Sequence, residues 1–148
     1  LFLATGGAQP PSPPYAGGRF SSGPVFTELL GKTLVPASGA APSVRTNLNF
    51  AFAGATAGPG GAVPSLHQQL GLFQLRGITP GTNDLFTVLA GANDVLNTLA
   101  LPSTPANPGA VAAAGAAAAN QVGGAVLTLV SAGAKNIVVL GLPDVGLT

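Results

Sequence analysis

The chain has 148 residues, of which 6% are charged, and its formal net charge is +1. That charge is too small for a nucleic-acid-binding surface, which needs clustered Lys and Arg to neutralise phosphates. The chain has no cysteine, which excludes disulfides and thiolate zinc sites. We therefore expect one domain or part of one, with no nucleic-acid partner, no metal and no cofactor. Low charge with abundant Gly, Ala, Ser and Thr favours a bacterial export product, secreted or at the cell surface.

The first half of the chain predicts a helix, a strand and a second helix. Residues 5–18 and 36–45 are rich in Gly, Pro and Ser and indicate loops. Between them, residues 24–31 show apolar side chains at helical spacing and end on a glycine. Residues 47–53 alternate apolar and small or polar side chains, which predicts a strand. Residues 64–75 repeat the helical spacing.

The second half predicts two strands separated by the longest helix. Residues 84–89 form a strand pattern, and a Pro-rich loop at 101–109 follows. Residues 109–132 keep one face apolar over a long helix, and Gly133 suits its C-terminal cap. Residues 136–142 are a continuous apolar run, as expected of a strand covered on both faces. Alternating strands and helices predict an α/β layer fold with a parallel sheet.

The uncharged stretch at 109–134 is also long enough for a membrane span, which needs about 20 apolar residues. It consists mostly of Ala and Gly, with Asn120 and Gln121 at its centre. Because alanine contributes little to insertion, we expect no transmembrane segment in this chain.

Two loops after predicted strands carry candidate functional residues. Gly54 follows the first strand directly, and a bare backbone N–H there can approach a ligand closely. Asn93 follows the second strand and offers an uncharged amide donor. Ligands bind at the carboxyl ends of parallel strands, and an N–H with an Asn amide is one way to build an oxyanion hole. Taken locally, however, the glycine is typical of a turn and the Asn-Asp pair of a turn or helix cap.

Four segments, in this order along the chain, resemble the conserved blocks of the SGNH/GDSL hydrolase family. They are Gly-Arg-Phe-Ser-Ser-Gly-Pro-Val at 18–25, Asn-Phe-Ala-Phe-Ala-Gly-Ala-Thr at 49–56, Ala-Gly-Ala-Asn-Asp at 90–94, and Gly-Ala-Lys at 133–135 leading to Leu-Pro-Asp-Val-Gly at 142–146. The phospholipase/lecithinase/haemolysin-like branch is the most similar in character. The resemblance covers nearly the whole chain.

The resemblance implies a three-layer α/β/α sandwich with a parallel, flavodoxin-like sheet. It implies a serine esterase or lipase that cleaves a small-molecule or lipid ester by a Ser-His-Asp acyl-enzyme mechanism. In that mechanism Gly54 supplies an oxyanion N–H and Asn93 supplies the side-chain donor.

The family's nucleophile and base are absent from the sequence. It contains neither the Gly-Asp-Ser block of the nucleophile nor the Asp-x-x-His block of the base. We therefore expect residues 1–148 to be a partial SGNH/GDSL domain, inactive alone, whose partner is the rest of the same domain. His67, the only histidine, is interpreted as a helix-surface residue. Ser21 and Ser22 are assigned no catalytic role, Asp94 is expected to brace its loop, and Asp144 to lie in a turn.

Two other interpretations remain open. The chain can be an SGNH-like binding module without catalysis, or an Ala/Gly/Pro-rich low-complexity segment that matches the family by chance. A Gly-Asp-Ser upstream and an Asp-x-x-His downstream would distinguish the enzyme from the binding module. A circular dichroism spectrum without helix for the full-length protein would favour the low-complexity segment.

Overall fold

A computed structural model of the chain describes residues 11, 13–16, 19–34, 48–103, 107 and 109–142. These residues form four helices and two strands: α1 (Phe26–Leu34), α2 (Leu66–Leu75), β1 (Leu85–Val88), α3 (Ala92–Leu99), α4 (Gly109–Ser131) and β2 (Asn136–Val139). The chain divides into an N-terminal unit, residues 1–53, and a C-terminal unit, residues 54–148. The predictions for residues 5–10 and 36–45 and for Asp144 lie outside the described residues.

In the N-terminal unit, the Glu28 side chain caps the start of α1 and also binds the preceding loop. Glu28, which is buried, accepts the Val25 backbone N–H at 2.9 Å, as the third helical residue does in a capping box. The same carboxylate pairs with the Arg19 guanidinium through an Nη2–Oε1 contact of 2.7 Å and an Nε–Oε2 contact of 2.9 Å. Arg19 therefore ties the Gly-Arg-Phe segment to the start of α1. The helix continues to Leu34 rather than ending at Gly31 as predicted, since the apolar spacing alone did not fix its end.

Because of the Arg19–Glu28 pair, the stability of this unit depends on pH. The hydrogen bond from Arg19 lowers the pKa of Glu28 below its ordinary value, against an opposing effect of burial. Because the pKa of Glu28 is lowered in the folded state, the pair stabilises the fold fully at pH values above the ordinary pKa of the carboxyl. This contribution is lost as the pH falls through the lowered pKa.

We therefore expect Glu28→Gln to cost about 1 kcal/mol near neutral pH and almost nothing once the parent carboxyl is protonated. Urea unfolding of both proteins between pH 7 and pH 3 measures the difference. A constant difference over that range would contradict the assignment.

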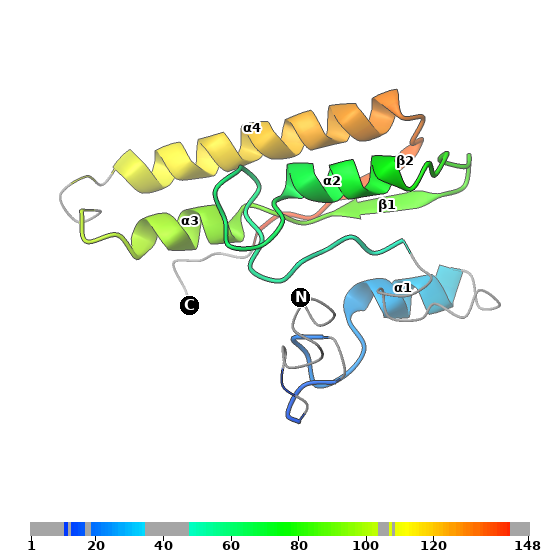
Figure 1. The fold of residues 1–148 in the computed structure, drawn as a ribbon, viewed down its shortest axis with the longest axis horizontal. Coiled ribbons are helices and arrows are strands. Elements are labelled where there is room, and N and C mark those ends of the chain that lie inside the picture. Colours follow the sequence, from blue (N-terminus) through cyan, green and yellow to red (C-terminus); the bar gives the residue numbers. More distant parts are fainter. Residues whose placement is uncertain are drawn as a thin grey trace. The chain divides into compact units, whose positions relative to one another are not determined.

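The C-terminal unit contains a parallel sheet of two strands. Leu85 pairs with Asn136 and Val88 with Val139, in register throughout, and the Leu140 N–H continues the ladder to the Val88 carbonyl at 2.9 Å. The connection from β1 to β2 passes through α3 and α4 (Figure 1). Both strands, their parallel pairing and the α/β class agree with the sequence prediction. The prediction that the strand at 136–142 is covered on both faces is wrong for β2, because only Ile137 of its four residues is partly buried.

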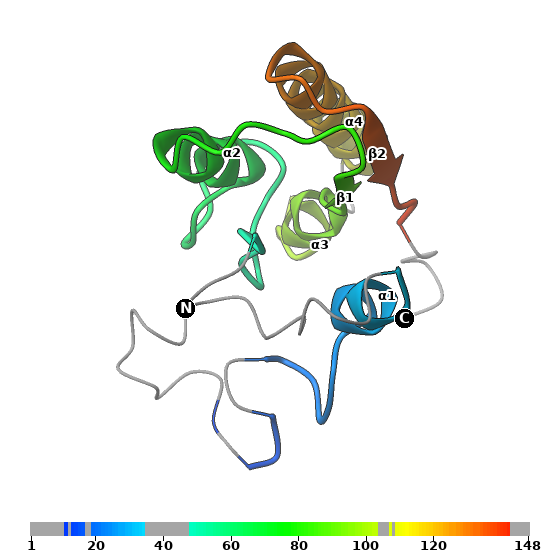
Figure 2. The ribbon, with the colours of Figure 1, turned by 90° about the vertical axis from the view of Figure 1, so that its right-hand side faces the viewer.

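The core of this unit lies where α2 packs against α4 and, through Phe73, against β1. Phe73 of α2 meets Phe86 of β1 edge to face, with 5.7 Å between ring centroids. Helix α4 contacts both α2 and α3 along its length (Figures 1 and 2). Its buried residues are Ala118, Ala125 and Leu129. Because two of these three are alanines, neighbouring elements can approach its axis closely.

Helix α4 ends as predicted. Gly133 adopts φ +105°, and the Ala134 N–H donates to the Leu129 carbonyl at 3.0 Å. This is the left-handed glycine cap that stops a helix without a steric penalty. By length and composition alone, with a mean hydropathy of 1.4, α4 could also cross a membrane.

The strand predicted at 47–53 is not observed. Residue 47 lies outside the described part, and residues 48–53 have no strand conformation. Among the described residues, the sheet contains only β1 and β2. An alternating pattern specifies which side chains a strand would bury, but a strand also needs a hydrogen-bonding neighbour. The described part of the chain supplies no such neighbour for this segment.

Candidate functional site

The first candidate residue, Gly54, opens the loop that leads into α2. We call residues 54–58 the Gly54 loop. Gly54 is exposed and has φ +80°, a conformation that costs an L-residue about 1–2 kcal/mol. No described residue accepts a hydrogen bond from its N–H. The glycine therefore allows a backbone turn that leaves an N–H open to a ligand.

The second candidate, Asn93, lies on a helix that the sequence interpretation had placed in a loop. Gly91 has φ +111° and occupies the N-cap position of α3, so Asn93 and Asp94 form the first turn of that helix. Val95 and Leu99, four residues apart, gave a helical signal. It was missed because the segment is short, between Gly91 and Pro102.

A hydrogen bond joins the two candidate segments. The Asn93 Nδ2 donates to the Ala55 carbonyl at 2.7 Å, although the residues are 38 apart in sequence. Since a carbonyl oxygen can only accept, this contact identifies the nitrogen of the amide. A primary amide has two N–H donors, and among the described residues Nδ2 has this one acceptor. The other N–H has no acceptor among the described residues.

The Asp94 carboxylate holds the same loop two residues further on. It accepts the Ala57 N–H at 2.8 Å and the Gly58 N–H at 3.3 Å. Asp94 therefore braces the Gly54 loop rather than its own segment.

The middle of the Gly54 loop is fixed to α2. The buried Thr56 donates its hydroxyl to the Gly58 carbonyl at 2.6 Å, and its own carbonyl accepts the Leu66 N–H at 3.0 Å. The loop is thus held by the first turn of α3 on one side and by the start of α2 on the other.

Comparison with known proteins identifies the family. The model of the GDSL-like Lipase/Acylhydrolase family matches residues 2–148. The chain belongs to that family. No curated protein and no solved structure matches it. Membership implies ester hydrolysis in general terms and an SGNH fold, and the resemblance seen in the sequence is confirmed.

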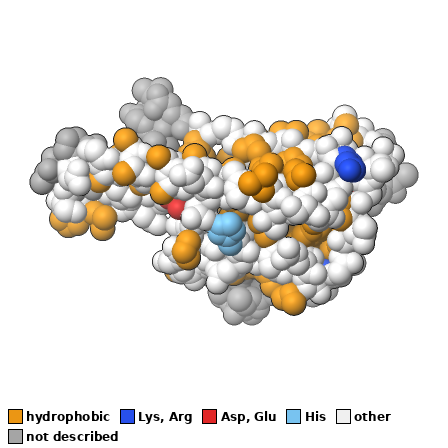
Figure 3. Space-filling model, turned by 90° about the horizontal axis from the view of Figure 1, so that it is seen from above, with side chains coloured by type: hydrophobic (Ala, Val, Ile, Leu, Met, Phe, Trp, Pro, Cys, Tyr) orange, Lys and Arg blue, Asp and Glu red, His pale blue; other side chains and the backbone are white. Residues whose placement is uncertain are grey.

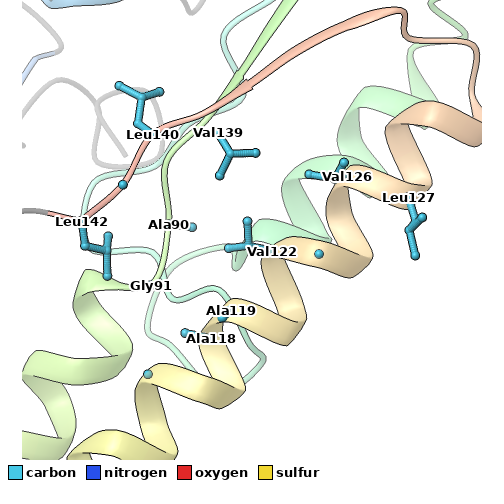
Figure 4. Close-up of a pocket in the computed structure, with 13 residues that line it drawn as sticks. Ala90, Gly91, Ala118, Ala119, Val122, Val126, Leu127, Val139, Leu140 and Leu142 are labelled. Carbon is cyan, nitrogen blue, oxygen red and sulfur yellow. The ribbon is translucent and has the colours of Figure 1, made fainter.

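An apolar groove of about 670 Å³ lies between α4 and the residues that follow β2 (Figure 4). Val126 of α4 and Val139 of β2 point toward each other across it, and Gly91 and Leu142 line one end. All of its lining residues are Gly, Ala, Val or Leu. In this GDSL chain the groove therefore offers apolar surface beside α3, whereas the hydrogen-bonding groups lie on the Gly54 loop and Asn93.

Two of the remaining polar candidates, His67 and Ser21, have hydrogen-bonding partners other than the Gly54 loop and Asn93. His67, the only histidine, is exposed on α2 (Figure 3), and its Nε2 contacts the Gln121 Oε1 of α4. The Ser21 hydroxyl accepts the Gly23 N–H at 3.3 Å in the N-terminal unit, and Ser22 is exposed there. Within the described ranges, no group of three or more His, Cys, Asp or Glu side chains could hold a metal ion.

Proposed function

We propose that this chain supplies two of the oxyanion donors of a serine ester hydrolase, the Gly54 N–H and the Asn93 amide. The observation that carries the proposal is the 2.7 Å hydrogen bond from Asn93 Nδ2 to the carbonyl of Ala55, the residue after Gly54. It brings the Gly54 N–H and an amide with one remaining donor to the same loop. Both donors are uncharged, as suits a site that stabilises negative charge only when it develops.

The proposed reaction is acyl transfer through a covalent intermediate. A serine attacks the ester carbonyl while a histidine, oriented by an aspartate, takes its proton. The carbonyl oxygen becomes an oxyanion, and the donors of Gly54 and Asn93 bind it more strongly than they bind the neutral carbonyl. The intermediate collapses to an acyl-enzyme as the alcohol leaves with the proton held by the histidine. Water then hydrolyses the acyl-enzyme, which releases the carboxylic acid and restores the serine hydroxyl. The serine and histidine belong to the family's Gly-Asp-Ser and Asp-x-x-His blocks.

The proposed fold of the complete domain is a three-layer α/β/α sandwich with a parallel, flavodoxin-like sheet. The parallel pairing of β1 with β2, the helical crossover between them and the family match support it. In such sheets, ligands bind at the carboxyl ends of the strands. Asn93 lies five residues after the end of β1, at the end of the sheet that this rule predicts.

The direct test measures hydrolysis of p-nitrophenyl butyrate, octanoate and dodecanoate. The test uses a protein in which this chain is joined to a Gly-Asp-Ser block and an Asp-x-x-His block, neither of which its sequence contains. We expect release of p-nitrophenol with an initial burst, as an acyl-enzyme accumulates, and labelling of the added serine by an organophosphonate. Binding of a non-hydrolysable ester analogue with no turnover would favour a binding module instead.

A further inference from the structure

The hydrogen-bonding partners of Asp94 are unusual for an acidic residue in the first turn of a helix. An acid in the first turn of a helix is usually stabilised by the free N–H groups of that same turn. The Asp94 carboxylate instead binds N–H groups 36 and 37 residues away, with its Oδ2 on Ala57 and its Oδ1 on Gly58. Both oxygens are thus used to hold the Gly54 loop.

Asn93 and Asp94 hold that loop through groups of opposite polarity. Asn93 donates to the Ala55 carbonyl, and Asp94 accepts from the N–H groups of Ala57 and Gly58. Only Thr56 lies between these anchors, and it is itself buried and hydrogen-bonded. The peptide planes from Ala55 to Gly58 are therefore fixed relative to the first turn of α3.

The position of the Gly54 N–H depends on these anchors. Gly54 is exposed, and a Cβ built on it would meet no atom within 4 Å. Since packing does not hold the residue, its placement comes from the chain that follows it. Loss of the Asp94 contacts would leave the loop held at Ala55 by Asn93 and at Thr56 by α2, with the peptide groups of Ala57 and Gly58 no longer fixed to α3.

We propose that Asp94 is a positioning residue, which aligns the Gly54 N–H with the Asn93 amide so that both donors meet one oxyanion. This inference rests on the proposed function and assigns a separate residue to it. Asp94 itself does not touch the substrate.

The test compares Asp94→Ala and Asp94→Asn with Asp84→Ala in a protein that hydrolyses esters. Asp84 is the matched control: its carboxylate also accepts a backbone N–H, that of Gly81 at 2.8 Å, but it directly precedes β1, at the opposite end of the strand from α3. A misplacement of about 1 Å in an active site can cost about 10²-fold in rate. For Asp94→Ala we expect a fall in kcat approaching that size with KM almost unchanged.

The kcat of Asp94→Asn should lie between those of the parent and Asp94→Ala, because the amide oxygen of the asparagine can accept a hydrogen bond from one of the two N–H groups. Asp84→Ala should leave kcat unchanged. In an Asn93→Ala background, Asp94→Ala should cost much less than it does alone, because the alignment it maintains has already lost one donor. Melting temperatures of all variants are measured in parallel, and rates are compared well below them.

The outcomes separate the two proposals. An unchanged kcat in Asp94→Ala or Asp94→Asn, with activity lost in Asn93→Ala, overturns the positioning role and leaves the proposed function intact. A loss in Asp94→Ala that is equally large with and without Asn93, or that accompanies a similar loss in Asp84→Ala, also overturns it as a merely structural effect. If Asn93→Ala has no effect on kcat, the proposed function itself fails.

Discussion

Asn93→Ala is expected to lower kcat by about 10²–10³-fold, the loss typical of removing one oxyanion donor. The effect should fall on kcat more than on KM, because the second amide N–H binds an oxygen whose negative charge develops only in the transition state. The variant also loses the hydrogen bond to the Ala55 carbonyl, which costs about 0.5–1.5 kcal/mol of stability. Steady-state kinetics on an octanoate ester with a parallel thermal melt measures both effects.

Asn97→Ala is the matched control for this variant. Asn97 lies one helical turn further along α3 and is exposed, so the same deletion on the same helix should leave kcat unchanged. Equal losses in the two variants would mean that α3 tolerates no such change, and a parental rate in Asn93→Ala would remove Asn93 from the mechanism.

Gly54→Ala is expected to reduce kcat by up to about 10²-fold, as the loss of a second donor would. The cause is conformational, because a Cβ at this position meets nothing within 4 Å. At φ +80° an alanine is strained by about 1–2 kcal/mol. A shift toward negative φ relieves this strain and turns the N–H away from the Asn93 amide.

Gly77→Ala is the control that separates the effect of backbone strain on stability from the effect of Gly54→Ala on kcat. Gly77 follows α2 with φ +62°, and an added methyl group would meet equally open space there, so its alanine variant should lose similar stability with no change in kcat. Chemical denaturation gives the first quantity and ester hydrolysis the second. A parental kcat for Gly54→Ala at the expected loss of stability would show that its N–H takes no part.

The elements that sequence reasoning predicted correctly are those whose apolar pattern is complete within one segment. The apolar spacing of α2 indicated the residues that it buries, and Gly133 indicated the cap of α4 by residue type. The apolar run of β2 indicated a strand but not its burial, since only Ile137 of its four residues is partly buried. The segment at 47–53 has an equally clear pattern, but a strand exists only with a neighbour, which no local pattern supplies. Helix α3 was missed because it has only eight residues, too few to show a clear helical repeat of apolar side chains.

The candidate site was predictable in its residues and not in the contacts that join them. Gly54 and Asn93 follow from the family resemblance and from their places after predicted strands. The Asp94 contacts with Ala57 and Gly58 and the Arg19–Glu28 pair join residues far apart in the chain or across a turn. Such contacts depend on how the segments meet, and a single sequence carries no direct signal for that.

The composition of α4 has a consequence for how the chain folds. Pairing Leu85 with Asn136 closes a chain segment of 51 residues, from 136 − 85, and closing long segments costs entropy that contacts must later recover. Alanine loses almost no side-chain freedom in a helix, and residues 110–122 are mostly alanine. This half of α4 is long enough to form helix transiently in the unfolded chain. In the fraction of unfolded molecules that contain this helix, the segment between the two strands has fewer conformations, so its closure costs less entropy when β2 pairs with β1.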